Sequence, residues 1–340
     1  YKRDAFSSEA GLKYFVLGAF SSGILLFGIS LIYGFSGSTN FDDIYSLFFP
    51  AVSLLSVNTG FLIGFIFFSV GFFFKLGVFP FHMWVPDVYE GSPTIVTTIL
   101  AVLSKFVIAI AFIKIYMYVF FSFSFYWYRI FLVLGTFSVV FASIAALYQD
   151  KIKRLLAYSG IAHMGYVLLA ASTNNIEGFF AAYYYLLVYS FTGLGIFIIL
   201  LSVRKYTNYL KIKTLSDFSS LFRNNPVIAF SFSAFMFSLA GIPPLAGFFS
   251  KLFVFLSLIK VESYLVSSLV IVTSVVSAVY YLWIIKVIFF KDYEVKTYYA
   301  PINLIQSNIV LFVLILNFFI FLFQNALSVW IINLIFSWYF

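Results

Sequence analysis

Apolar residues occupy the chain in long segments that are separated by short polar stretches. Ten segments can be marked, at about residues 8–34, 44–59, 61–85, 93–119, 127–147, 154–172, 177–203, 225–257, 262–290 and 304–335. A helix needs about 20 apolar residues to cross the hydrocarbon core of a bilayer, and only the segment 44–59 is short enough to be tilted or interfacial. The pattern predicts an all-α polytopic membrane protein with about ten transmembrane helices.

Composition agrees with this class, because 63% of the residues are hydrophobic and 9% are charged, against about 25% charged in soluble domains. Assigning successive loops to alternate faces gives ten lysines and arginines to one face and four to the other, which includes residues 1–7. Loops inside the cell or organelle carry the excess of basic residues. The basic face, with loops 148–154 and 204–223, is therefore predicted to be cytoplasmic or matrix-facing, and no nucleic-acid binding is expected from charges spread in this way.

The chain contains no cysteine. Disulfides, zinc–thiolate sites and iron–sulfur clusters held by this chain are thereby excluded. Two histidines and the lack of a glycine-rich phosphate loop indicate no place for a redox cofactor.

The stretch Gly71 to Thr94 places a charge beside helix-breaking residues. Lys75 lies in an apolar segment and is followed by Pro80 and Pro86. A charge at bilayer depth costs at least about 2.5–3.5 kcal/mol, and a proline removes a backbone donor that lipid cannot replace. A buried base beside a broken helix indicates an ion path in a transporter.

Further charges lie at membrane depth. Lys105 and Lys251 are inside apolar segments, and Glu9 is nearer a segment end. The alternatives are lysines that snorkel to the interface and a local Glu9–Lys13 pair at i, i+4. For His82 and His163 a structural role is the first interpretation and proton relay the second. Asp87 and Glu90 are interpreted as residues of a capped turn. Ordinary snorkelling or loop charges are expected near the segment ends, at Lys114, Arg129, Lys260 and Lys286.

Burial disfavours the ammonium form, so a buried lysine gains and loses its proton more readily than an exposed one. A buried Glu–Lys pair titrates as a coupled unit, and three lysines in three helices form a series of proton stations. Pro243 and Pro244 interrupt the segment 225–257 as Pro80 and Pro86 interrupt 61–85. These interrupted spans predict one membrane domain over 1–340 with inverted repeats at 8–119 and 127–290, followed by a C-terminal helix at 304–335.

Four blocks, FKLGVFPFHMWVPDVYEGSPT, SKF, YSGIAHMGY and SLAGIPPLAGFFSK, resemble the antiporter-like, proton-translocating subunits of respiratory complex I. Within that family DVYEGSPT resembles the subunit 2 branch of NADH dehydrogenase. Mrp-type cation antiporters share the fold and are the closest alternative. A third possibility is a structural membrane subunit of complex I that does not pump.

The resemblance implies roles for residues that match the family's motifs. Glu9 would modulate Lys75, Lys105 would relay protons, and Lys251 would serve the exit side. Flavin, iron–sulfur clusters and ubiquinone would reside in other subunits, and this chain would hold no cofactor or metal.

The resemblance also implies a setting. The chain would lie in the mitochondrial inner membrane with its basic loops on the matrix side. It would contact lipid and other complex I membrane subunits, including neighbouring antiporter-like ones. Because the first apolar segment aligns with the family's fifth helix, the resemblance implies that the first repeat is incomplete, and a separate polypeptide is expected to supply the missing N-terminal helices.

Overall fold

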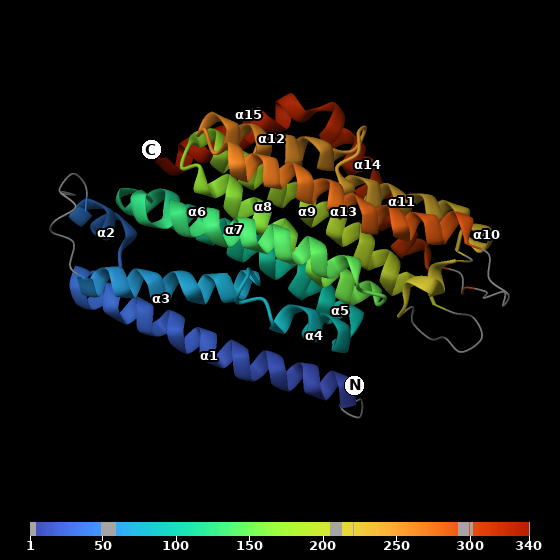
Figure 1. Ribbon diagram of the computed structural model, residues 1–340, viewed down its shortest axis with the longest axis horizontal. Helices are drawn as coiled ribbons and strands as arrows, with labels where there is room; N and C mark the ends of the chain where they lie inside the picture. Colours follow the sequence, from blue (N-terminus) through green and yellow to red (C-terminus); the bar gives the residue numbers. More distant parts are fainter. Residues whose placement is uncertain are drawn as a thin grey trace.

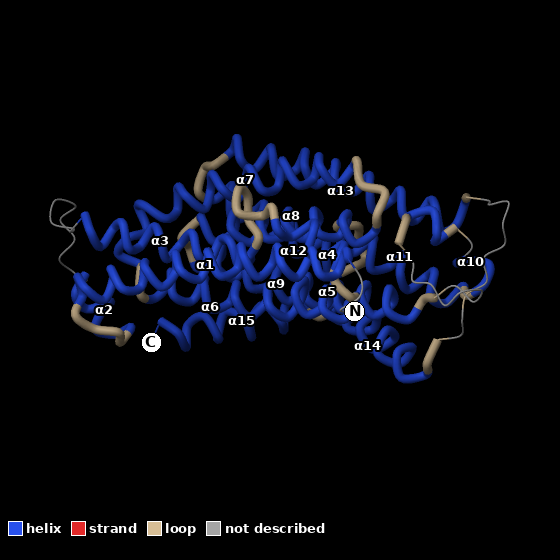
Figure 2. The backbone as a smooth tube through the Cα atoms, turned by 90° about the horizontal axis from the view of Figure 1, so that it is seen from below, coloured by secondary structure: helices blue, strands red, loops and turns tan. Residues whose placement is uncertain are grey.

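The computed structural model describes residues 5–48, 59–204, 213–219, 221–291, 299 and 302–339. Nearly all of this chain is helical (Figure 2). Eight helical spans are long and apolar enough to cross a membrane. They are α1 (Ala5–Ser36), α3 (Thr59–Leu76), the run α5–η1–α6 (Thr94–Thr98, Ile99–Leu103, Ser104–Tyr118), η2–α7 (Phe121–Phe123, Ser124–Leu147), α8 (Ile152–Ser172), α9 (Ile176–Ser202), α13 (Tyr264–Phe290) and α14 (Leu304–Leu322). The predicted all-α membrane class is confirmed.

The remaining apolar segments form shorter helices. In segment 44–59 the structure describes α2 (Phe41–Phe48), and residues 49–58 lie outside the described residues. Segment 61–85 ends as a helix at Leu76 and resumes at α4 (Trp84–Gly91), and 225–257 divides into α11 (Pro226–Ala240) and α12 (Ala246–Lys260). The other short helices are η3 (Leu215–Phe218), α10 (Leu221–Asn224) and α15 (Gln324–Tyr339).

The helices run along the long axis of one bundle (Figure 1). α8 and α9 lie at its centre and are buried on nearly every side. α1 lies at an edge against α3 and buries only Ala10, Ser21, Gly28 and Ile32. Glycine allows this approach, since a Cβ on Gly28 would lie 2.5 Å from the Phe68 backbone nitrogen.

α1 and α3 are antiparallel neighbours, because Gly28 faces Gly64 and Leu25 faces Gly71. Their connection therefore starts and ends on one face of the bundle. The start of α1 lies on the other face, where Gly91 approaches the Phe6 carbonyl. The prediction that segment 1–7 lies opposite the loops 86–92 and 148–154 is wrong for its described residues, because it counted a full span between α1 and α3.

The two interrupted helices end alike. Gly77 (φ 70°) and Gly241 (φ 87°) adopt the left-handed conformation that favours glycine. The next amide donates back across the turn in each case, from Val78 to the Phe73 carbonyl and from Ile242 to the Phe237 carbonyl, both at 3.1 Å. This is the Schellman arrangement, which satisfies carbonyls that a helix end leaves unpaired.

The predicted breaks are confirmed at Pro80, Pro243 and Pro244, which follow these turns. The prediction for Pro86 is wrong, because Pro86 lies in the first turn of α4, where a missing amide hydrogen costs no intrahelical bond. The α3–α4 and α11–α12 pairs run in opposite directions (Figure 1).

Candidate functional site

Lys105 is the most deeply buried charge among the described residues, with an exposed fraction of 0%. Its Nζ has no hydrogen-bond partner there and lies 5.6 Å from the centre of the Tyr89 ring. A Cβ on Gly160 of α8 would lie 3.1 Å from this nitrogen, so glycine leaves the space that the ammonium group occupies. Lys105 thus sits in a closed, mostly apolar site with an aromatic face as its closest electrostatic support.

A π-helical turn, η1, immediately precedes Lys105. Two tyrosines from other helices bind carbonyls of this turn: the Tyr89 hydroxyl donates to Leu100 at 3.2 Å, and the Tyr189 hydroxyl donates to Ala101 at 3.3 Å. Single π-helical turns occur often at functional sites, because the widened turn changes which carbonyls are free. Both hydroxyl groups are thus bound to the helical turn that immediately precedes Lys105.

Lys251 lies in α12, shortly after the second break, and is half-buried. Its Nζ donates to the Ala240 carbonyl at 2.8 Å and to the Ser277 hydroxyl of α13 at 3.3 Å. Ala240 ends α11, and the last carbonyls of a helix lack internal partners and carry partial negative charge. The ammonium group therefore stabilises, and is stabilised by, the end of the broken helix.

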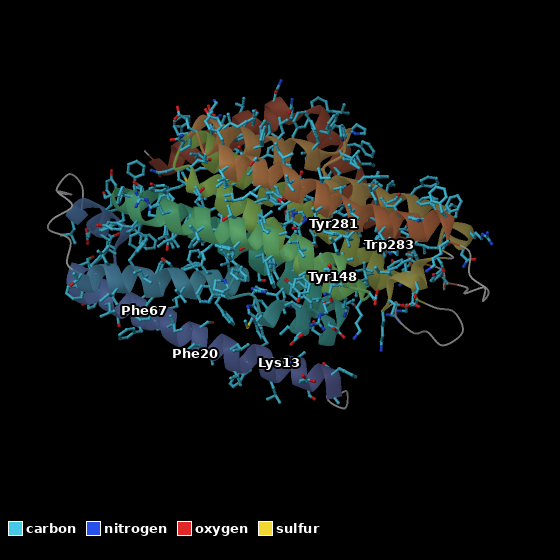
Figure 3. The ribbon with its side chains drawn as sticks, in the orientation of Figure 1. Lys13, Phe20, Phe67, Tyr148, Tyr281 and Trp283 are labelled. Carbon is cyan, nitrogen blue, oxygen red and sulfur yellow. The ribbon has the colours of Figure 1, made fainter. Side chains whose placement is uncertain are left out.

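His163 connects the surroundings of the two lysines from the centre of the bundle. Its Nδ1 lies 2.7 Å from the Tyr185 hydroxyl and its Nε2 lies 3.0 Å from the Tyr281 hydroxyl. Toward Lys105, its ring is 5.0 Å from that of Tyr189. Tyr281 projects from α13 within the middle of the bundle (Figure 3).

Tyr166 completes the series on the other side of His163. Its ring lies 5.6 Å from that of Tyr185, and the Nζ of Lys251 lies 5.8 Å from its centre. Buried hydroxyl and imidazole groups thus extend from Lys105 to Lys251 through α9, α8 and α13. The sequence alone did not single out these tyrosines. The signal that could have found them is a phenol hydroxyl, which needs a hydrogen-bond partner, within an otherwise apolar helix.

The other two predicted proton sites are placed differently. Lys75 is exposed in the last turn of α3, and Glu9 is 60% exposed and pairs with Lys13 at 2.8 Å. Since Leu25 faces Gly71, Lys75 lies level with about Ser21 of α1, which puts Glu9 roughly 18 Å further along that helix at 1.5 Å per residue. The structure places Lys105 and Lys251 beside the same group of buried rings, and it pairs Glu9 with Lys13 instead of Lys75.

His82 is buried in the first break between two rings, 5.3 Å from that of Phe79 and 5.0 Å from that of Phe141. Its Nδ1 has no hydrogen-bond partner among the described residues. It lies apart from the His163 series, so a relay role for His82 stays a prediction. The segment-end charges are exposed, as expected: Lys114, Arg129, Lys260 and Lys286.

Asp87 and Glu90 are ion-paired and do not form an isolated capped turn. Asp87 binds Lys13, and both carboxylates bind Arg154 at the start of α8. Glu90 also binds Lys151. The ion pairs border a cavity of about 560 Å³.

Residues 1–277 match the family NADH:quinone oxidoreductase/Mrp antiporter, TM. The NADH-ubiquinone oxidoreductase chain 2 of Marchantia polymorpha is 40% identical over 329 residues, which cover 96% of this chain and 66% of that protein. A chain of respiratory complex I from Thermus thermophilus is 32% identical, with a TM-score of 0.78 over 94% of this chain and 68% of that chain. A chain of the Mrp complex from Dietzia sp. has a TM-score of 0.84 over 96% of this chain and 67% of that chain, at 20% identity, which shows a shared fold.

The chain spans just under two thirds of the length of the Marchantia relative. The family match covers all four sequence blocks and both helix breaks. It also includes Lys105, His163 and Lys251. The chain belongs to the antiporter-like membrane subunit family of NADH:quinone oxidoreductases and Mrp antiporters.

Proposed function

We propose that this chain is a proton-translocating membrane subunit of an NADH:ubiquinone oxidoreductase, and that Lys105 and Lys251 hold the transported proton. The observation that carries the proposal is a fully buried lysine without a hydrogen-bond partner among the described residues. It lies beside a group of buried tyrosines packed around His163, and a second lysine borders the same group at Tyr166. The 40% identity to a protein named NADH-ubiquinone oxidoreductase chain 2 supports the setting.

The chemistry follows from the groups that line the path. A tyrosine hydroxyl both donates and accepts, and histidine offers one nitrogen of each kind when neutral. A proton can therefore enter His163 from one hydroxyl and leave toward the other. Charge at Lys251 is stabilised by the Ala240 carbonyl and the negative end of α11. Lys105 has an aromatic face beside it and no hydrogen-bond partner among the described residues.

The wider assignments belong to the same proposal. Electron transfer takes place in other subunits, which hold the flavin, iron–sulfur clusters and ubiquinone; for the clusters the reason is that this chain has no cysteine to ligate them. The location is the mitochondrial inner membrane, with the basic loops in the matrix and other complex I membrane subunits as neighbours. The separate polypeptide that completes the first repeat stays a prediction, as does the role of Lys75 and Glu9.

The inverted repeats at 8–119 and 127–290 are also proposed. Their support is the identical helix ending at Gly77 and Gly241 together with the opposite directions of the two broken helices.

A cation/proton antiporter without redox partners is the second candidate, favoured by the fold shared with the Mrp complex. At 20% identity that likeness concerns the fold, whereas the 40% identity concerns an oxidoreductase subunit. A purely structural subunit has no use for a desolvated lysine, whose burial costs several kcal/mol. Co-purification with a flavin and iron–sulfur arm separates the oxidoreductase from the antiporter.

The test is Lys105→Met in the assembled complex, with Lys114→Met as the control on the exposed face of the same helix, α6. Protons transported per NADH oxidised are measured in sealed vesicles. We expect a lower proton yield for Lys105→Met and an unchanged yield for the control. A full yield from an assembled Lys105→Met complex would establish the structural subunit instead.

A further inference from the structure

Five charged side chains join three helices at one face of the bundle. Asp87 of α4 accepts from Lys13 of α1 at 2.9 Å and lies 3.6 Å from Nη2 of Arg154. Glu90 of α4 accepts from Nη1 of Arg154 at 3.3 Å and from Lys151. Lys13 lies on α1 beside α4 (Figure 3). We name this set the α4 clamp: Lys13, Asp87, Glu90, Lys151 and Arg154.

A further bond attaches the same end of α8 to α4. Lys153 donates to the carbonyl of Ser92, the residue that ends α4, at 2.7 Å. α4 has only eight residues and follows the broken stretch 77–83. A helix this short is not stable by itself, so contacts with its neighbours fix its position.

α4 carries a side chain of the candidate site on its inner surface. Tyr89, between the two clamp carboxylates in sequence, is fully buried, binds the Leu100 carbonyl of the π-helical turn and lies under the Lys105 ammonium group. α8 carries Gly160 on another side of that group. The spacing of α4 and α8 therefore sets the room around the Lys105 nitrogen.

We infer that Arg154 is a positioning residue for Lys105: by binding both carboxylates of α4, it holds Tyr89 on the π-helical turn and against the ammonium group. This inference rests on the proposed function. Arginine suits the task because its planar fork reaches two acceptors at once, whereas a lysine is a single point of charge. Partly exposed ion pairs add little to folding stability, so the main expected effect is on proton transfer.

The experiment measures the rate of proton transport per assembled complex. Arg154→Gln is expected to lower it about threefold to tenfold, as for coupled neighbouring groups, and Arg154→Lys to give an intermediate rate. Lys260→Gln is the matched control, because it removes the same charge from an exposed pair with Glu177 and is expected to transport normally. If Arg154→Gln does not assemble, Arg154→Lys decides, and its full rate overturns the inference.

A double-mutant cycle with Tyr89→Phe separates positioning from general destabilisation. If Arg154 acts through the Tyr89 hydroxyl, Arg154→Gln costs less in the Tyr89→Phe background than alone. Equal losses in both backgrounds, or a normal rate for Arg154→Gln, overturn the inference. Lys105→Met is run alongside: full transport by that variant overturns the proposed function, whereas a loss there with a normal Arg154→Gln overturns only the positioning role.

Discussion

At the residue scale, the same residue type has three different environments in this chain. Lys105 is enclosed, Lys251 is bonded to the end of a broken helix, and Lys75 is exposed in the last turn of α3. The first two border the group of rings around His163, Lys105 beside Tyr189 and Lys251 beside Tyr166. The differences arise from packing of distant segments, since all three lysines lie in similarly apolar sequence.

Gly160→Ala tests the room beside Lys105. The added methyl would lie 3.1 Å from the Lys105 nitrogen and 3.0 Å from the Tyr189 hydroxyl, so both must shift by a few tenths of an ångström. We expect a complex that assembles but transports protons more slowly. The comparison is Gly18→Ala, where no atom lies within 4 Å of the added carbon. Equal transport by both variants contradicts the tight enclosure of Lys105.

His163→Phe removes the partner of two buried hydroxyls, those of Tyr185 and Tyr281. A buried hydroxyl left without a partner costs about 1–3 kcal/mol, and this applies to Tyr185, whereas Tyr281 keeps its interactions with Ser159 and Tyr280. Thermal stability and transport should therefore both fall. His163→Gln restores hydrogen bonding without an exchangeable ring proton, and is expected to recover stability but not transport. Thermal unfolding of the purified complex and proton yield in vesicles distinguish the two effects, and a recovered yield for His163→Gln argues against a relay.

The local Glu9–Lys13 pair could be named from the sequence as an alternative, because it depends on neighbours in the chain. The apolar flanks marked Lys105 and Lys75 alike, and only packing separates the buried lysine from the exposed one. The tyrosine series could not be predicted. Tyr89, Tyr185 and Tyr281 meet their partners only when α4, α9 and α13 pack around α8. The relative positions of packed helices cannot be read from the pattern of apolar residues.

At the element scale, two helices of the bundle are broken, and Lys251 follows the second break and binds the helix end that the break exposes. The breaks at Pro80, Pro243 and Pro244 could be predicted from the sequence, because proline lacks an amide hydrogen wherever it occurs. Pro86 carried the same signal and lies inside α4, since the first turn of a helix tolerates proline. Pro80 and Pro243 each follow a left-handed glycine that ends a helix, whereas Pro86 follows no such glycine directly and lies inside a new helix.

Gly77→Ala and Gly241→Ala test these turns. A side chain disfavours the left-handed conformation by about 1–2 kcal/mol, and the added carbon would lie 2.6 Å from Val85 or 2.9 Å from the Lys251 side chain. We expect both variants to lower the thermal unfolding temperature of the complex. Gly241→Ala should also slow transport, because it displaces Lys251. Unchanged stability in both variants would contradict the assigned helix endings.

At the scale of the whole molecule, one face gathers the start of α1, the end of α4 and the start of α8. The order of apolar segments predicted the bundle and its alternating directions. It misplaced the start of α1, because the 16-residue segment 44–59 was counted as a full span when the loops were assigned to faces, although it was short enough to be interfacial.

Membrane-impermeant maleimide labelling checks this arrangement, and the chain's lack of cysteine makes single replacements clean reporters. Phe6→Cys and Tyr148→Cys, both at exposed positions, should label from one side of the membrane. Val261→Cys, beyond α12, should label from the other. Labelling of Phe6→Cys together with Val261→Cys would refute the placement of α1.

The bond between Lys251 and the Ala240 carbonyl has a mechanical consequence. In the proposed mechanism, the proton held by Lys251 is both the transported ion and the charge that stabilises the end of α11. Removing it withdraws a stabilisation that, at a helix end, amounts to about 0.3–2 kcal/mol. Each time Lys251 gains or loses a proton, the end of α11 would gain or lose this stabilisation. Proton movement would therefore be coupled to the stability of the connection between α11 and α12.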